Sequence, residues 1–90
     1  MRKLLLATTA VALSAGAVSA EDIKIGVILG FTGPIESLTP QMGAAAEMAM
    51  AEVNASGALL GGSTLTSVRG DSTCIDAGAA TAVAERLITS

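Results

Sequence analysis

Hydrophobic and polar positions follow two different periods along the chain, and together they predict four alternating elements. Residues 23–29 form a short, β-branched, nearly continuous apolar run, which is typical of a parallel strand buried on both faces. Residues 63–69 are rich in Ser and Thr and predict a weaker, more polar strand, suited to a sheet edge. Residues 40–56 and 76–88 carry apolar side chains at helical spacing. The order strand, helix, strand, helix predicts an α/β protein with a parallel sheet.

Capping residues predict where the two helices begin and end. We expect Thr39 to be the N-cap of the first helix, with Pro40 at its first position and Gly57 ending it. Glu47 lies off the apolar side of that helix. The expected buried stripe comprises Met42, Ala45, Ala46, Ala49, Met50 and Val53. Asp76 is the expected N-cap of the second helix, whose buried stripe comprises Ala80, Val83, Ala84, Leu87 and Ile88.

The connection after the first strand is unusually long. Residues 30–39 exceed the two to six residues, roughly, of an ordinary strand-to-helix loop, and Gly33 and Pro34 mark a turn inside it. Long loops after a strand often carry function, so we single this loop out as a candidate site.

The first twenty residues predict a secretory signal peptide. Arg2 and Lys3 give a positive start, an apolar run follows, and small residues close the segment. Cleavage is expected between Ala20 and Glu21. The alternative is a membrane anchor, but the uncharged stretch is at the lower length limit for a span and is diluted by Ser, Thr and Gly. We therefore expect residues 21–90 to be exported, with no stable membrane insertion after cleavage.

Composition narrows the chemistry. Hydrophobic types make up 51% and charged types 14%, which excludes a disordered polyelectrolyte. The chain has no His and a single cysteine, Cys74, so the commonest general base is missing and a disulfide within these 90 residues is impossible. A formal charge of -3 argues against nucleic-acid binding. Asp71 and Asp76 flank Cys74, but no third metal ligand is evident, and a strand-end turn plus a helix cap explains both. No cofactor is predicted.

Several segments, in this order, resemble one known family. They are Lys24 to Pro34, Gly43 to Ala49, Glu52 to Gly57, Leu60 to Gly62 and Asp71 to Asp76. Together they look like the opening of the branched-chain amino-acid (leucine/isoleucine/valine) binding proteins of bacterial ABC importers. The resemblance covers essentially all of residues 21–90.

The resemblance implies a type I periplasmic binding fold, in which two α/β lobes close on a ligand. Residues 21–90 would form the first part of the first lobe. Two strands and two helices bury too little surface to form a stable sheet alone, so we expect this chain to be the amino-terminal piece of a longer protein.

Ligands of open α/β sheets bind at the carboxyl ends of the strands. The expected ligand-binding residues therefore lie in the loop after the first strand: Phe31, Thr32, Gly33, Pro34 and Ser37. The alternative is an ordinary surface loop with Phe31 packed beneath it. The resemblance also implies that Cys74 forms a disulfide with a cysteine beyond Ser90, and the alternative is a free thiol.

The implied function is not enzymatic. The protein would capture amino acids or related small polar solutes and deliver them to a membrane importer permease. A nucleotide- or flavin-dependent enzyme is the rival class, but the first strand-to-helix turn breaks the spacing of the dinucleotide-binding motif. A non-functional exported fragment is a third possibility.

Overall fold

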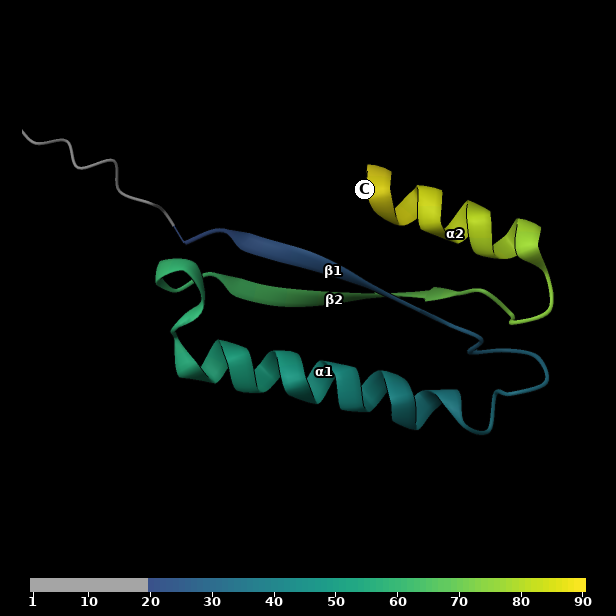
Figure 1. Ribbon diagram of the computed structural model, residues 1–90, viewed down its shortest axis with the longest axis horizontal. Helices are drawn as coiled ribbons and strands as arrows, with labels where there is room; N and C mark the ends of the chain where they lie inside the picture. Colours follow the sequence, from purple (N-terminus) through teal and green to yellow (C-terminus); the bar gives the residue numbers. More distant parts are fainter. Residues whose placement is uncertain (1–19) are drawn as a thin grey trace, which may run out of the picture.

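Residues 20–90 are described by a computed structural model, and they form two parallel strands between two helices (Figure 1). The predicted signal peptide lies outside the described residues, apart from Ala20. The elements in chain order are β1 (Asp22–Leu29), α1 (Thr39–Ser56), the 3-10 turn η1 (Leu59–Gly61), β2 (Thr64–Asp71) and α2 (Ala77–Thr89). The α/β class and the strand, helix, strand, helix order are confirmed.

The two strands are in register from end to end. Asp22 pairs with Thr64 at one end of the ladder, and Leu29 pairs with Asp71 at the other. Because the strands are parallel, the loops that follow them emerge from the same edge. The sheet thus places the β1–α1 loop beside the β2–α2 loop, which Figure 1 shows on the right.

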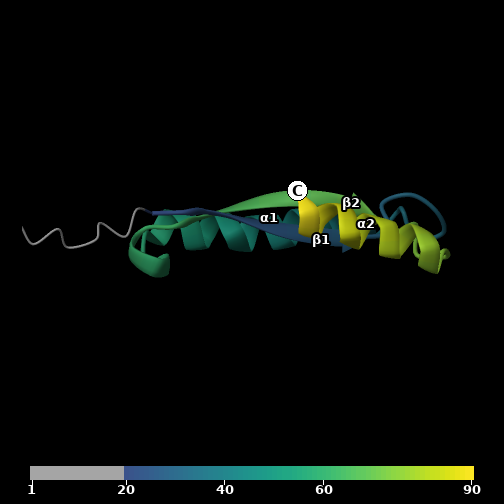
Figure 2. The ribbon, with the colours of Figure 1, turned by 90° about the horizontal axis from the view of Figure 1, so that it is seen from above.

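Side-chain alternation along the strands assigns one helix to each face of the sheet. On one face, Asn54 and Glu47 of α1 bond to β2. On the other face, a Cβ on Gly26 would lie 2.9 Å from Leu87, and one on Gly70 would lie 2.3 Å from Val83. The two views of the ribbon show α1 and α2 flanking the strands (Figures 1 and 2). Glycines on the α2 face therefore allow that helix to approach the sheet closely.

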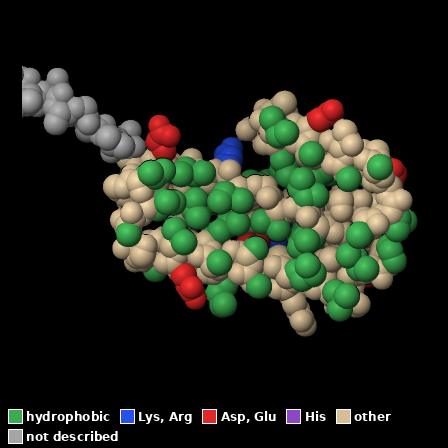
Figure 3. Space-filling view, in the orientation of Figure 1, with side chains coloured by type: hydrophobic (Ala, Val, Ile, Leu, Met, Phe, Trp, Pro, Cys, Tyr) green, Lys and Arg blue, Asp and Glu red, His purple; other side chains and the backbone are tan. Residues whose placement is uncertain are grey.

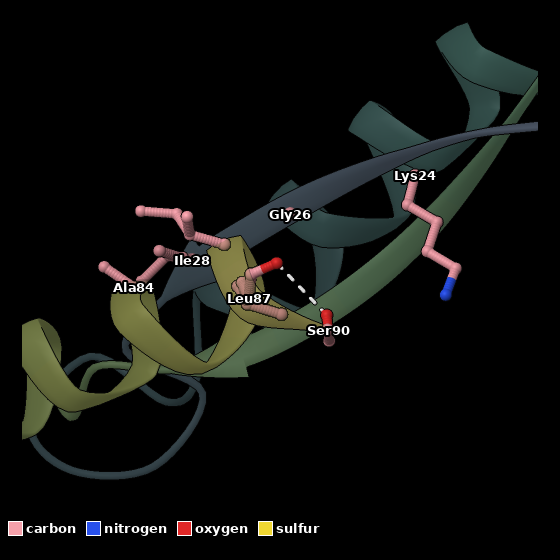
Figure 4. Close-up of a pocket in the computed structure, with 7 residues that line it drawn as sticks. Lys24, Gly26, Ile28, Ala84, Leu87 and Ser90 are labelled. Carbon is pink, nitrogen blue, oxygen red and sulfur yellow. Dashed lines mark hydrogen bonds between the residues drawn. The ribbon is translucent and has the colours of Figure 1, made fainter.

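The expectation that β1 is buried on both faces is wrong for the described residues. Its residues alternate between exposed and half-buried, and Ile28 on the α2 face is 38% exposed. The cause is an open groove of about 510 Å³ between β1 and α2, lined by Ile28, Leu87 and Ile88 among others (Figure 4). Hence α2 covers only part of that face.

The start of α1 also differs from expectation. Thr39 is the first helical residue, preceded by Leu38, and no side chain caps the helix. Thr39 is completely buried, and its hydroxyl donates a 2.9 Å hydrogen bond to the carbonyl of Gly30. Instead of capping its own helix, the hydroxyl thus satisfies the backbone at the end of β1. The predicted helix end is confirmed, because Gly57 adopts the left-handed conformation with φ of 64°.

The buried side of α1 is rotated from the predicted stripe. Gly43 is buried and Met42 is 52% exposed. Glu47, expected off the buried side, is half-buried against β2, because Arg69 and Ser67 bond its carboxylate there. The half-buried residues of α1 are Ala46, Glu47, Met50, Val53 and Asn54.

The prediction for α2 is closer. Asp76 is its N-cap and accepts hydrogen bonds from the amides of Gly78 and Ala79. The expected stripe is half-buried except for Ile88, which is 82% exposed.

Across residues 20–90 no hydrophobic side chain is fully buried, and Figure 3 shows hydrophobic side chains over the visible face between the helices. None of the described helices is long and apolar enough to cross a membrane.

Candidate functional site

The candidate site is the edge of the sheet where β1 and β2 both end. The β1–α1 loop contributes residues 30–38, and the β2–α2 loop contributes residues 72–76. The parallel register brings these loops together although they lie about forty positions apart in the sequence. Because parallel strands present their carboxyl ends to ligands, this is the edge at which the sequence analysis expects binding.

One carboxylate joins the two loops. Asp71, the last residue of β2, accepts a 3.2 Å hydrogen bond from the amide of Thr32 through Oδ1, and a second from the Thr32 hydroxyl through Oδ2. The amide of Thr73 donates to the same Oδ1 at 2.9 Å. We call this set of three residues, Asp71, Thr32 and Thr73, the Asp71 clasp. These bonds, the one from the Thr32 hydroxyl foremost, hold the pKa of the Asp71 carboxyl below its ordinary value.

Close backbone contacts reinforce the Asp71 clasp. A Cβ on Gly33 would lie 2.7 Å from the carbonyl oxygen of Thr73, and one on Gly30 would lie 2.7 Å from the Cβ of Cys74. Thr73 and Cys74 themselves adopt positive φ angles of 59° and 63°. Two glycines on one loop therefore fit against a tight turn on the other, and larger residues at these glycines would separate the loops.

Phe31 lies on the α1 side of the site. A Cβ on Gly43 would come within 3.1 Å of its ring, and the Arg69 guanidinium stands 5.0 Å from the ring centroid. Arg69 is in turn paired with Glu47 through two hydrogen bonds of 2.7 and 2.9 Å. Arg69, foremost, lowers the pKa of the Glu47 carboxyl, and Glu47 raises the pKa of the guanidinium. Phe31 is thus half-buried against α1. This position agrees with the alternative in which Phe31 packs beneath a surface loop.

The other expected ligand-binding residues are exposed. Thr32, Gly33, Pro34 and Ser37 all lie at the surface of the β1–α1 loop. The Thr32 hydroxyl and amide are already bonded to Asp71, whereas the Ser37 hydroxyl forms no hydrogen bond within residues 20–90. The structure therefore brings the five predicted residues onto one loop but gives them different roles.

Cys74 is exposed and is a free thiol within the described residues. It lines a shallow depression of about 310 Å³ with Ser72, Ile75 and the start of α2. The disulfide implied by the resemblance stays a prediction. Within residues 20–90 no group of three or more metal-ligating side chains comes together, and Asp71 and Asp76 act as the turn and the helix cap expected of them.

Comparison with known proteins decides the family. The family model described as periplasmic binding protein matches residues 22–90. The chain belongs to the periplasmic binding protein family. It is similar to Leu/Ile/Val-binding protein homolog 7 of Brucella abortus (strain 2308), with 39% identity over 89 residues. The same identity and length relate it to Leu/Ile/Val-binding protein homolog 7 of Brucella suis biovar 1 (strain 1330).

Each of these alignments covers 98% of this chain but 22% of the relative. The chain thus spans about a fifth of the length of the curated relatives that it matches. No solved structure gives a significant match. The resemblance seen in the sequence is confirmed at the level of the family.

The sequence analysis missed the Asp71 clasp. It assigned Asp71 to a strand-end turn, which the bond to Thr73 confirms, but not to the partner loop. A strand-final Asp preceding a turn, opposite a Thr that follows the neighbouring parallel strand, is a signal that would have suggested the contact.

Proposed function

We propose that this chain is part of an exported solute-binding protein of an ABC importer. The protein captures leucine, isoleucine, valine or a related small solute in the periplasm and delivers it to a membrane permease. The family match to residues 22–90 carries this proposal. The Brucella relatives are named Leu/Ile/Val-binding protein homologs, which favours branched-chain amino acids as the solute.

The β1–α1 loop supplies one wall of the binding site in this proposal. Its exposed Ser37 hydroxyl and the backbone at Gly33 and Pro34 contact the polar head of the solute, Thr32 shapes the loop, and Phe31 supports it from below. The opposing wall belongs to a second lobe, and the solute stabilises the closed arrangement because it contacts both walls only there. No step of this function is enzymatic and none uses a cofactor.

Ligand-dependent thermal stabilisation of the intact protein tests the proposal. Saturating leucine, isoleucine or valine should raise the melting temperature, because a ligand that binds only the folded state stabilises it. If none of the three amino acids shifts the melting temperature or gives heat in a calorimetric titration, the proposed solute class is wrong.

A single hydroxyl tests the proposed wall. Ser37→Ala should weaken solute binding by roughly two- to tenfold, the value of one lost hydrogen bond. Ser56→Ala is the matched control, because Ser56 is also exposed but lies at the other end of α1, where it bonds the Val53 carbonyl. If the two variants bind the solute with equal affinity, Ser37 does not contact it.

A further inference from the structure

The two loops at the carboxyl edge are bonded to each other by a charged side chain. Asp71 takes three hydrogen bonds, two from Thr32 on one loop and one from Thr73 on the other. None of these bonds belongs to the strand ladder or to a helix. These side-chain bonds therefore hold the edge in addition to the backbone bond from the amide of Ser72 to the carbonyl of Leu29.

The packed core cannot hold these loops in place. No hydrophobic side chain in residues 20–90 is fully buried, and the loop residues Thr32, Gly33, Pro34 and Ser37 are exposed. The buried attachment of the β1–α1 loop lies at its two ends, where Thr39 bonds the carbonyl of Gly30, and exposed residues away from such an attachment open at low free-energy cost. Bonds to an ionised carboxylate are stronger than neutral ones, which makes the Asp71 clasp the principal polar restraint on the β1–α1 loop beyond Thr39.

We infer that Asp71 is a positioning residue that fixes the solute-facing loop before the solute arrives. It acts through Thr32, because its carboxylate oxygens already accept three hydrogen bonds from Thr32 and Thr73. This inference rests on the proposed function. With the Asp71 clasp in place the loop is already ordered, and binding does not have to restrain it.

Asn54 provides a matched control for Asp71. Its side-chain amide donates to the carbonyl of Leu65 at 2.9 Å and accepts from the amide of Leu65 at 2.7 Å. It therefore anchors β2 with a similar number of hydrogen bonds, but near the start of the strand and away from the candidate site. Asp71→Ala and Asn54→Ala should both lower the melting temperature, whereas only Asp71→Ala should weaken leucine binding, by about tenfold.

The experiment is isothermal titration of the intact protein with leucine, paired with amide hydrogen exchange. Asp71→Ala should speed exchange across residues 31–38, and Asn54→Ala should not. Thr32→Val replaces the hydroxyl with a methyl group and keeps the amide, so it should weaken leucine binding less than Asp71→Ala does. Thr32→Ser keeps the hydroxyl and should bind leucine as tightly as wild type. Adding Thr32→Val to Asp71→Ala should cause no further loss, because the two residues act through one contact.

The outcomes separate the two proposals. If wild type fails to bind leucine, isoleucine and valine, the proposed solute class is wrong and the positioning role argued for it falls as well. If wild type binds but Asp71→Ala binds equally well, or if its loop exchanges as slowly as in wild type, the proposed function stands and the positioning role is overturned. Equal weakening by Asn54→Ala would reduce Asp71 to a general stabilising residue and would also overturn it.

Discussion

The contact between Gly70 and α2 gives a sharp test of how closely the helix lies on the sheet. Gly70 is buried in β2, and a Cβ there would stand 2.3 Å from a Val83 methyl and 3.2 Å from a Leu87 methyl. An ordinary contact begins at 3.4 Å, so Gly70→Ala requires a shift of about 1 Å. Val83 cannot readily rotate away, because β-branched side chains in helices keep one rotamer.

The cost of this substitution follows from its geometry. Overpacking by a methyl group destabilises a protein by about 1–3 kcal/mol, and lifting α2 would also weaken the Leu87 contact with Gly26. We expect a loss of about 2 kcal/mol for Gly70→Ala in urea unfolding of the intact protein. Gly26→Ala should cost less, because the atom it meets is the end of the flexible Leu87 side chain.

A compensating variant separates overpacking from other effects. Val83→Ala removes the obstructing methyl groups, so the double variant Gly70→Ala with Val83→Ala should be more stable than the sum of the single changes predicts. Additive losses, or a Gly70→Ala protein as stable as wild type, would show that α2 does not lie where the structure places it.

Three further predictions concern other contacts. The pKa of Asp71 is lowered in the folded protein, so its contribution to stability is present above the ordinary aspartate pKa and is lost as the pH falls through the lowered value. Asp71→Asn should therefore show a smaller acid-induced shift of the urea midpoint than wild type. Equal shifts would contradict the lowered pKa of Asp71. Glu47→Gln should weaken the bonds to Arg69 and, through Arg69, the contact with the Phe31 ring. In urea unfolding, Glu47→Gln should therefore lower the free energy of unfolding more than the control Glu52→Gln, which changes an exposed residue. Residues 21–90 expressed alone should unfold without a cooperative transition by circular dichroism, because they bury no hydrophobic side chain fully; a steep transition would refute this.

Local sequence rules predicted the features that depend on neighbours in the chain. Asp76 as a helix cap and Gly57 as a helix end follow from residues within four positions. The parallel sheet follows from the alternation of strands and helices. These features can be predicted without knowledge of the tertiary contacts.

Features that depend on distant partners were predicted poorly. The sequence predicts Glu47 away from the sheet because it lies off the apolar stripe of its helix, yet its partner Arg69, 22 positions further on, bonds it at the interface with β2. Thr39 was expected to cap its own helix, but the carbonyl of Gly30 takes its hydroxyl. In both cases a polar side chain serves a partner that periodicity cannot reveal.

A carboxylate lies at each end of the sheet, but the two carboxylates join different parts of the chain. At the starting end, Asp22 accepts hydrogen bonds from the hydroxyls of Thr64 and Thr66 and so joins two strands that the backbone ladder already pairs. At the carboxyl end, an ionised carboxylate joins two loops that glycines bring within contact of each other. A carboxylate can accept several hydrogen bonds at once, so Asp71 restrains the β1–α1 loop at Thr32, which lies beyond the paired strands. The carboxyl edge can therefore depart from strand geometry while its two loops stay joined.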